Sequence, residues 1–458
     1  MNNATKCLAK YAATIKFEEL PDNIVLSAKS CIKDSIACML GGSTTKPGRQ
    51  VIELVTTMGG IEEATVIGEP KTIPASWAAY VNGFLANACD MDDNYFGMGH
   101  PGAAIIPTAL ALGESRGING ADVISAVVAG YEVLTRVGKS MLPTGILTRK
   151  VRGQITWMIF GSIAVAGRLM GFNAQQMATA FGIAATHASV PFLAKLGYQD
   201  RPMNTIKNNF GWCCMGAILA AELTDRGFLG TTSILDGDNG FWRMAGTSWS
   251  NWEGLLDNLG KEYEIPLIQF KKYPSCYGTH PALEGMRMAM QKLPTDDKEI
   301  EKVIITGPRH LLRFKDYQPI DLTDSQFSIP YVLAMLIKGK EPGPDWWDEK
   351  NIHDPEILAE ARKVELQPVP SFEEANKKGY FQAEVTIYTK EGHTSSGFGQ
   401  VPLAAGDKGL DEKQLDQKFK ILAAPLLDAV RVERIIDLVN KLERLPDIRE
   451  LMGLLRKK

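Results

Sequence analysis

Apolar residues recur every three or four positions through most of residues 1–265. This spacing places them on one face of an α-helix, which repeats every 3.6 residues. In a strand, by contrast, successive side chains point to opposite faces, so the period is two residues. Two helix boundaries look alike. Gly117-Ile118-Asn119 and Gly171-Phe172-Asn173 each offer a glycine that can end one helix and an asparagine that can cap the next. We therefore predict stacked helices for this part of the chain.

The pattern changes after Pro266. The sequence VIITG at Val303–Gly307 predicts a short strand, and FQAEVTIYTKEGHTSSGF predicts a β-hairpin that turns at Glu391-Gly392. The later segment KFKILAAPLLDAVRVERIIDLVNKLERL returns to the helical period, so we expect it to pack back on the helices. The expected fold is mainly α with an α+β portion. Its large helical domain is formed by residues 1–267 and 401–458, and its smaller α/β domain by residues 268–400.

Composition limits the class of protein. The chain has 458 residues, of which 45% are apolar and 22% charged, so it can bury a large core. Its 50 Lys and Arg against 53 Asp and Glu give a net charge of −3, which offers no global attraction for nucleic acid or an anionic membrane. The seven cysteines form no CxxC pair, and we expect them to be reduced. No export signal or bilayer-length apolar run is seen, so we expect a cytoplasmic protein.

One motif suggests a nucleotide but does not have the required surroundings. Residues 97–102, GMGHPG, match the pattern GxGxxG. A dinucleotide-binding loop must follow a strand, however, and the preceding sequence SWAAYVNGFLANACDMDD is helical in pattern. We do not expect nucleotide binding.

The same region nevertheless contains the highest concentration of side chains that could take part in catalysis. On a continuous helix, Asp90 and Asn94 would share a face, and a glycine-rich loop would return His100 toward them. An acid, an amide and an imidazole would then converge, and the helix expected after the loop would offer free N–H groups to a carboxylate. In the alternative interpretation, Asp90 only bonds to its own loop, and Asp92 and Asp93 are solvated charges.

Two further segments can supply cations. Lys207 lies at the expected start of the apolar helix in MNTIKNNFGWCCMGAILAAELTDRG. Lys271 and Lys272 lie in FKKYPSCYGTHP at the expected domain junction, and clefts between domains often bind ligands. These lysines can neutralise substrate carboxylates, or they can be ordinary surface residues. We interpret Cys276 as a packed cysteine and not as a nucleophile.

Metal sites have little support in the sequence. Neither HExxH nor a Cys/His quartet occurs, and a short acidic cluster such as DMDD is a common solvated motif. We predict that no metal is required.

Ordered motifs along almost the whole chain resemble those of the MmgE/PrpD family, which includes 2-methylcitrate dehydratase, cis-aconitate decarboxylase and iminodisuccinate epimerase. The motifs are ACDMDD with GHPGAAIIPTALALGE, FGSIAVAGRLMGF with AFGIAATHAS, MNTIKNNFGWCCMGAILAAELTDRGFLG, FKKYPSCYGTHPALEG and SQFSIPYVLAMLI. The resemblance implies a large all-helical domain built from both chain ends, a smaller α/β lid domain, a homodimer, and catalysis without an obligatory cofactor.

The resemblance also implies a substrate pocket. Its members correspond here to an acid, a polar side chain, a loop histidine, two lysines and a lid tyrosine: Asp90, Asn94, His100, Lys207, Lys271 and Tyr331. One position departs from the family. Where many members have a histidine before the FGS helix, this chain has VRGQIT, so either Arg152 or Gln154 takes that place. The departure weakens the decarboxylase and methylcitrate assignments, whereas an arginine there still suits an acidic substrate.

These residue types suit proton transfer beside a carboxylate. Removing such a proton needs a base and cations that stabilise the enolate-like intermediate, and expelling hydroxide needs an acid. Asp90, His100 and Lys207 or Lys271 provide these groups, and the base and acid roles of Asp90 and His100 stay open because their pKa values depend on burial. We expect a lyase, in the first place a hydro-lyase, acting on a small di- or tricarboxylate. The alternatives are an epimerase or isomerase, a cis-aconitate-type decarboxylase, and a catalytically silent helical dimer that binds a metabolite.

Overall fold

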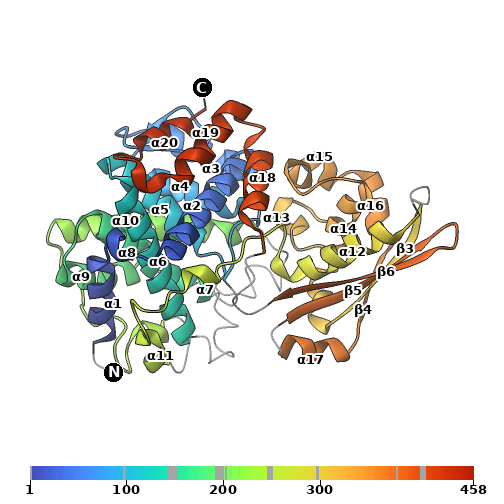
Figure 1. The fold of residues 1–458 in the computed structure, drawn as a ribbon, viewed down its shortest axis with the longest axis horizontal. Helices are drawn as coiled ribbons and strands as arrows, with labels where there is room; N and C mark the ends of the chain where they lie inside the picture. The colour runs from blue at the N-terminus through green and yellow to red at the C-terminus, as the bar shows by residue number, and fades with distance from the viewer. Residues whose placement is uncertain are drawn as a thin grey trace.

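The computed structural model describes residues 3–95, 99–141, 153–190, 201, 204–244, 251–294, 299–377, 380–402 and 409–457. A large body of helices lies beside a smaller part that contains a four-stranded sheet (Figure 1). The expected mainly α fold with an α+β portion is confirmed. None of the described helices has both the length and the apolar content that crossing a membrane requires.

The elements follow the predicted order. The first helices are α1 (Ala4–Thr14), α2 (Asp22–Ser43), α3 (Lys46–Met58), α4 (Ala75–Ala88), α5 (Gly102–Arg116), α6 (Gly120–Met141), α7 (Gly153–Thr156), α8 (Met158–Leu169), α9 (Ala174–Ala185), α10 (Thr205–Asp225) and α11 (Trp252–Leu256), with a short hairpin of β1 (Ala64–Thr65) and β2 (Thr72–Ile73) before α4. The α/β part contains α12 (His280–Lys292), β3 (Ile300–Gly307), α13 (Leu322–Ser325), α14 (Ile329–Ile337), α15 (Glu349–Ile352), α16 (Pro355–Ala361), β4 (Val364–Pro368), α17 (Ser371–Lys377), β5 (Tyr380–Thr389) and β6 (Thr394–Pro402). The last helices are α18 (Glu412–Ala423), α19 (Ala429–Asn440) and α20 (Arg449–Leu454).

The helix boundaries marked by glycine and asparagine form as predicted. Gly117 ends α5 with a φ of 63°, and the Asn119 side chain accepts the backbone N–H of Asp122 at 2.9 Å at the start of α6. Gly171 has a φ of 70°, and Asn173 caps α9 in a reciprocal capping box with Gln176. Glycine suits these positions because it adopts positive φ without a clash of its side chain.

The sheet of the α/β part has the order β4-β3-β5-β6. β3 pairs in parallel with β4 and antiparallel with β5, and β5 and β6 form the predicted antiparallel hairpin. Gly392 in its turn has a φ of 89°. Helix α12 packs on β5 and β6.

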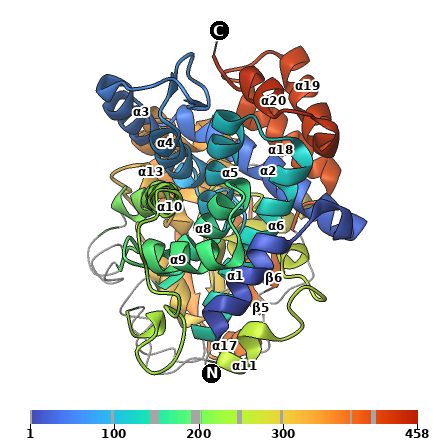
Figure 2. The ribbon, with the colours of Figure 1, turned by 90° about the vertical axis from the view of Figure 1, so that its left-hand side faces the viewer.

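After β6 the chain returns to the helical body. Helix α18 packs on α2, and α20 packs on α5, so the two ends of the chain share one core (Figure 2). The predicted return of the C-terminal segment is confirmed. This arrangement places residues of α2 and α18 next to the loop that follows α4.

Helices α4 and α10 cross closely at two glycines. A Cβ atom on Gly211 would lie 2.3 Å from the backbone oxygen of Tyr80, and one on Gly83 would lie 3.1 Å from the Cα of Gly211. Lys207 lies one turn before Gly211 in α10, and its ammonium group lies 3.2 Å from Asp90, which follows the end of α4.

We expect Gly211→Ala to lower the free energy of unfolding by about 1–3 kcal/mol, because the added methyl group meets rigid backbone and forces the helices apart. Gly453→Ala in α20 is the matched control, since a Cβ there meets no atom within 4 Å. Urea unfolding of both variants measures the difference. Equal stability of the two variants would show that the crossing tolerates a side chain.

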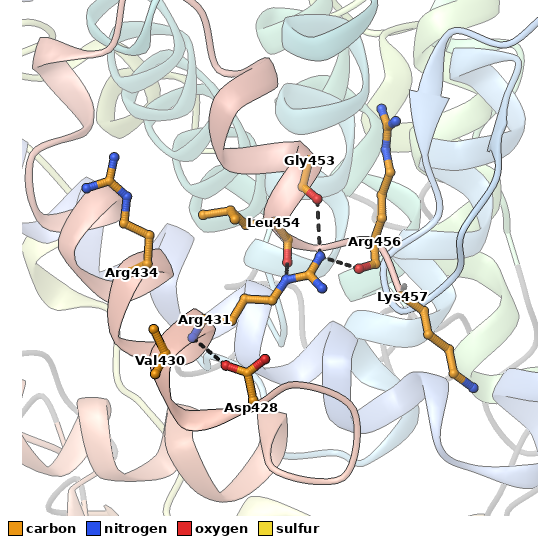
Figure 3. Close-up of a pocket in the computed structure, with 8 residues that line it drawn as sticks. All are labelled: Asp428, Val430, Arg431, Arg434, Gly453, Leu454, Arg456 and Lys457. Atoms are coloured by element: carbon orange, nitrogen blue, oxygen red, sulfur yellow. Dashed lines mark hydrogen bonds between the residues drawn. The ribbon is translucent and has the colours of Figure 1, made fainter.

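A surface pocket lies at the C-terminal helices, beside α19 and α20 (Figure 3). The Arg431 side chain crosses it and donates to the carbonyl oxygens of Leu454 at 2.6 Å and Gly453 at 3.2 Å. Its backbone N–H donates to Asp428, which caps α19. The guanidinium thus terminates α20, and we do not assign this pocket to a substrate.

Candidate active site

Side chains from three segments of the chain surround Asp90 in the loop after α4. Asp90 Oδ1 lies 3.2 Å from Lys207 Nζ, 3.2 Å from Lys271 Nζ and 3.4 Å from His100 Nε2. The three partners come from the start of α10, the segment before α12 and the residues before α5. The structure brings together the aspartate, the histidine and the two lysines that the sequence analysis singled out, and we call these four residues the Asp90 cluster. Their catalytic roles stay predictions.

The backbone of Asp90 turns the chain into this cluster. α4 ends at Ala88, and Asp90 has a φ of 51°, in the left-handed region that aspartate adopts more readily than most residues. The Asp90 side chain is only 3% exposed, and those of Lys207 and Lys271 are 3% and 1% exposed. A buried carboxylate of this kind needs the two ammonium groups to compensate its lost hydration.

The charges decide the protonation state of Asp90. Burial alone would raise the pKa of Asp90, but the ammonium groups of Lys207 and Lys271 outweigh that effect and hold the pKa well below its ordinary range. Asp90 is therefore a carboxylate at neutral pH and has no proton to donate.

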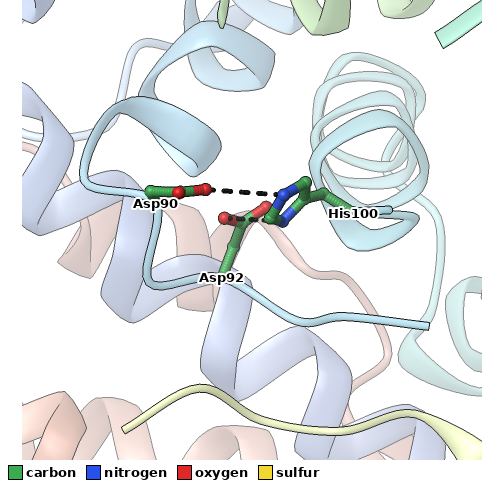
Figure 4. Close-up of side chains that lie close together, drawn as sticks. All are labelled: Asp90, Asp92 and His100. Carbon is green, nitrogen blue, oxygen red and sulfur yellow. Dashed lines mark ion pairs between the residues drawn. The ribbon is translucent and has the colours of Figure 1, made fainter. Parts of the chain in front are cut away.

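His100 is the most open member of the Asp90 cluster, with 12% of its side chain exposed. Its Nδ1 lies 3.2 Å from Asp92 Oδ1 and 3.1 Å from the backbone oxygen of Asp93, while Nε2 points toward Asp90 (Figure 4). A carboxylate at one ring nitrogen fixes the orientation and the tautomer of an imidazole. Asp92 is thus a partner of His100 that sequence reasoning missed.

Asp93 lies in the same loop and bonds to the two helices that follow it. Its side-chain oxygens accept the N–H of Gly102 at 2.9 Å and the hydroxyl of Tyr131 at 2.6 Å. Burial and the nearby Asp92 raise the pKa of Asp93 well above its ordinary value. The interpretation of Asp92 and Asp93 as solvated charges is wrong, since they are 1% and 2% exposed. The N–H of Gly102 at the start of α5 is thus already bonded to the side chain of Asp93.

Asn94 does not lie on a helix with Asp90, contrary to the prediction, because α4 has already ended. Instead it forms a two-residue antiparallel bridge with Gln269, in which the backbone bonds are 2.8 and 2.9 Å. Its side-chain amide donates to Gln269 Oε1 at 3.1 Å. The bridge ties the loop after α4, which we call the Asp90 loop, to the segment that contains Lys271. The predicted contact of Asn94 with substrate stays a prediction.

The remaining predicted residues are not brought to the Asp90 cluster by any contact among the described residues. Tyr331 is buried in α14, and its hydroxyl donates to the backbone oxygen of Trp346 at 3.3 Å. Arg152 lies outside the described residues, and Gln154 belongs to α7 but its side chain is not among those described. Their roles in substrate binding stay predictions.

Asp90, Asp92 and His100 also resemble a metal-ligand set. One potential ligand atom from each lies within 4.8 Å of the other two (Figure 4). The ammonium groups of Lys207 and Lys271, however, both lie 3.2 Å from the Asp90 oxygen. A divalent cation at that oxygen would meet two positive charges, which disfavour it strongly in a buried site.

We therefore expect activity to survive exhaustive chelation. After treatment with EDTA and desalting, kcat should stay within about twofold of the untreated value, because the lysines already neutralise Asp90. The assay is turnover before and after treatment, together with elemental analysis of the protein. Loss of turnover that one defined metal restores would contradict this expectation.

The sequence matches two family models that together span most of the chain. The MmgE/PrpD N-terminal domain matches residues 6–251, and the MmgE/PrpD C-terminal domain matches residues 273–444. The second match includes α18 and α19, which pack on α2.

Curated relatives cover the chain from end to end. Human cis-aconitate decarboxylase is 25% identical, over 100% of this chain and 95% of the relative. The mouse enzyme of the same name is 25% identical over 100% and 94%, and that of Aspergillus terreus 23% over 99% and 96%. With the two family models and the ordered motifs, these matches confirm the resemblance seen in the sequence. The chain belongs to the MmgE/PrpD family.

Proposed function

We propose that this chain is a lyase that acts on a small di- or tricarboxylate, and that dehydration is the reaction to test first. The observation that supports it is the Asp90 cluster: two buried lysines and one imidazole surround a carboxylate that cannot itself donate a proton. Lysines so placed can bind substrate carboxylates and stabilise the negative charge that develops when a neighbouring carbon loses its proton.

In this proposal His100 is the base. Asp92 at Nδ1 leaves Nε2 to accept the proton from the carbon beside a carboxylate. The electron pair of that C–H bond forms the new double bond as the carbon–oxygen bond breaks. The leaving hydroxide takes a proton from the imidazolium or from a lysine ammonium and departs as water.

Decarboxylation is the second candidate, and the names of the relatives favour it. In decarboxylation the bond between a substrate carbon and its carboxylate breaks and carbon dioxide leaves. The electron pair of the broken bond stays on the substrate carbon, beside the two lysines. His100 in its protonated form then delivers one proton to that carbon. The same residues serve both reactions, and the starting protonation state of His100 distinguishes them.

The test uses the purified protein in deuterated water with a panel of hydroxy-, amino- and unsaturated polycarboxylates that includes cis-aconitate and 2-methylcitrate. NMR follows each compound. Formation of a double bond with loss of water supports dehydration, and release of carbon dioxide with one deuterium in the product supports decarboxylation. Exchange with inversion would replace the lyase by an epimerase. Binding without turnover of any compound would overturn the enzymatic proposal.

A further inference from the structure

A buried lysine from the C-terminal end of the chain lies behind the Asp90 cluster. Lys418 in α18 has only 3% of its side chain exposed. Its Nζ donates to Asp34 Oδ1 in α2 and to the backbone oxygen of Met91, each at 2.5 Å, and to the backbone oxygen of Lys271 at 3.1 Å. An ammonium group has three N–H donors, and each of these acceptors can take one.

The position of Lys418 on its helix is unexpected. It lies on the same face as three fully buried apolar side chains, Leu415, Phe419 and Leu422. A charge in such surroundings loses its hydration, and an apolar side chain of similar size often gives equal or higher stability. Stability therefore does not account for a lysine at this place.

The acceptors of Lys418 indicate what it does. Met91 lies between Asp90 and Asp92, and Lys271 supplies one of the two ammonium groups at Asp90. One ammonium thus fixes the backbone on both sides of the 3.2 Å contact between Asp90 Oδ1 and Lys271 Nζ. Asp34 balances its charge. Burial alone would lower the pKa of Lys418, but the Asp34 carboxylate raises it above its ordinary value, so the donor stays charged.

We propose that Lys418 is a positioning residue, which holds the Asp90 loop and the Lys271 segment in register from the C-terminal helix. It acts through the backbone and need not touch substrate. The kinetic part of its test rests on the proposed function, whereas the structural part does not.

The test compares Lys418→Met with the double variant Asp34→Asn/Lys418→Met. The single variant leaves the Asp34 carboxylate buried without its partner, so we expect a lower melting temperature. The double variant removes both charges and should regain most of that loss. In both, the carbonyl groups of Met91 and Lys271 lack their donor, so kcat per folded molecule should fall about tenfold or more.

The same pair of helices offers a matched control. Lys33 in α2 is 2% exposed and pairs with Asp416 at 2.6 Å and Glu412 at 3.2 Å, both in α18. Lys33→Met should therefore lower the melting temperature and leave kcat per folded molecule unchanged. An equal loss of kcat in Lys33→Met, or full recovery of kcat in the double variant, would reduce Lys418 to a contributor to stability.

A structural measurement decides the matter even if no compound of the panel is turned over. A crystal structure of the double variant gives the separation of Asp90 Oδ1 and Lys271 Nζ, and we expect it to increase by about 1 Å or more. A separation that stays near 3.2 Å would overturn the positioning role. Absence of turnover in the wild-type protein would instead refute only the proposed function.

Discussion

His100→Gln is expected to lower kcat by about 10²- to 10⁴-fold, the usual contribution of a general acid or base. Glutamine keeps a polar group of similar reach but cannot exchange a proton near neutral pH. The folded protein should persist, because His100 lies at the open side of the Asp90 cluster and 12% of its side chain is exposed. Turnover per folded molecule, measured beside the melting temperature, checks both statements.

His393→Gln is the control for this substitution. His393 is exposed at the turn between β5 and β6. These two strands belong to the α/β part, whereas α4 lies in the helical body (Figure 1). Its replacement should change neither quantity. If His100→Gln kept its turnover, proton transfer would have to be assigned to another group. If it lost stability and turnover together, His100 would be a structural residue of the loop.

Lys207→Met and Lys271→Met are each expected to lower kcat/KM by at least about tenfold, equivalent to about 1.4 kcal/mol of transition-state stabilisation. Each variant removes one charge that can bind a substrate carboxylate. Asp90 keeps the other lysine in either case, at 3.2 Å, so no carboxylate is left without a cation. Methionine preserves most of the side-chain volume, which limits the loss of packing.

Lys272 provides the comparison for Lys271. It is the next residue in the chain, its side chain is 42% exposed, and it pairs with Glu284 at 3.0 Å. Lys272→Met should leave kcat/KM within about twofold, because exposed ion pairs contribute little. Near-wild-type kinetics for both Lys207→Met and Lys271→Met would remove the lysines from the substrate site. A similar loss for Lys272→Met would point to a general effect of charge.

Parts of the structure that depend on neighbours in the chain could be predicted from the sequence. The helix boundaries at Gly117 and Gly171 formed as expected, since a glycine that adopts positive φ and an asparagine that caps the next turn act over a few residues. The hairpin turn at Gly392 formed for the same reason. The residue types of the Asp90 cluster were also identified, because acids, lysines and histidines among apolar helices are chemically conspicuous.

Contacts between distant segments were predicted poorly. The sequence pattern predicts that Asn94 shares a helix face with Asp90, but the helix ends at Ala88 and the partner of Asn94 is Gln269. In one alternative the sequence places Asp92 and Asp93 in solvent, yet both are buried, and Asp93 bonds to Gly102 of α5 and Tyr131 of α6. Local sequence does not report burial, because burial depends on which other segments cover a residue.

By itself, the sequence determined the helical period, the caps, the hairpin and the identity of the reactive groups, since these follow from backbone preferences within a few residues. Only the tertiary structure decided that Asp90 stays a carboxylate, because that depends on two lysines more than 100 residues away in the chain. It likewise decided the place of Lys418, whose three acceptors lie in three separate segments. A lysine on an apolar helix face is visible in the sequence, but its partners are chosen by the packing of the whole chain.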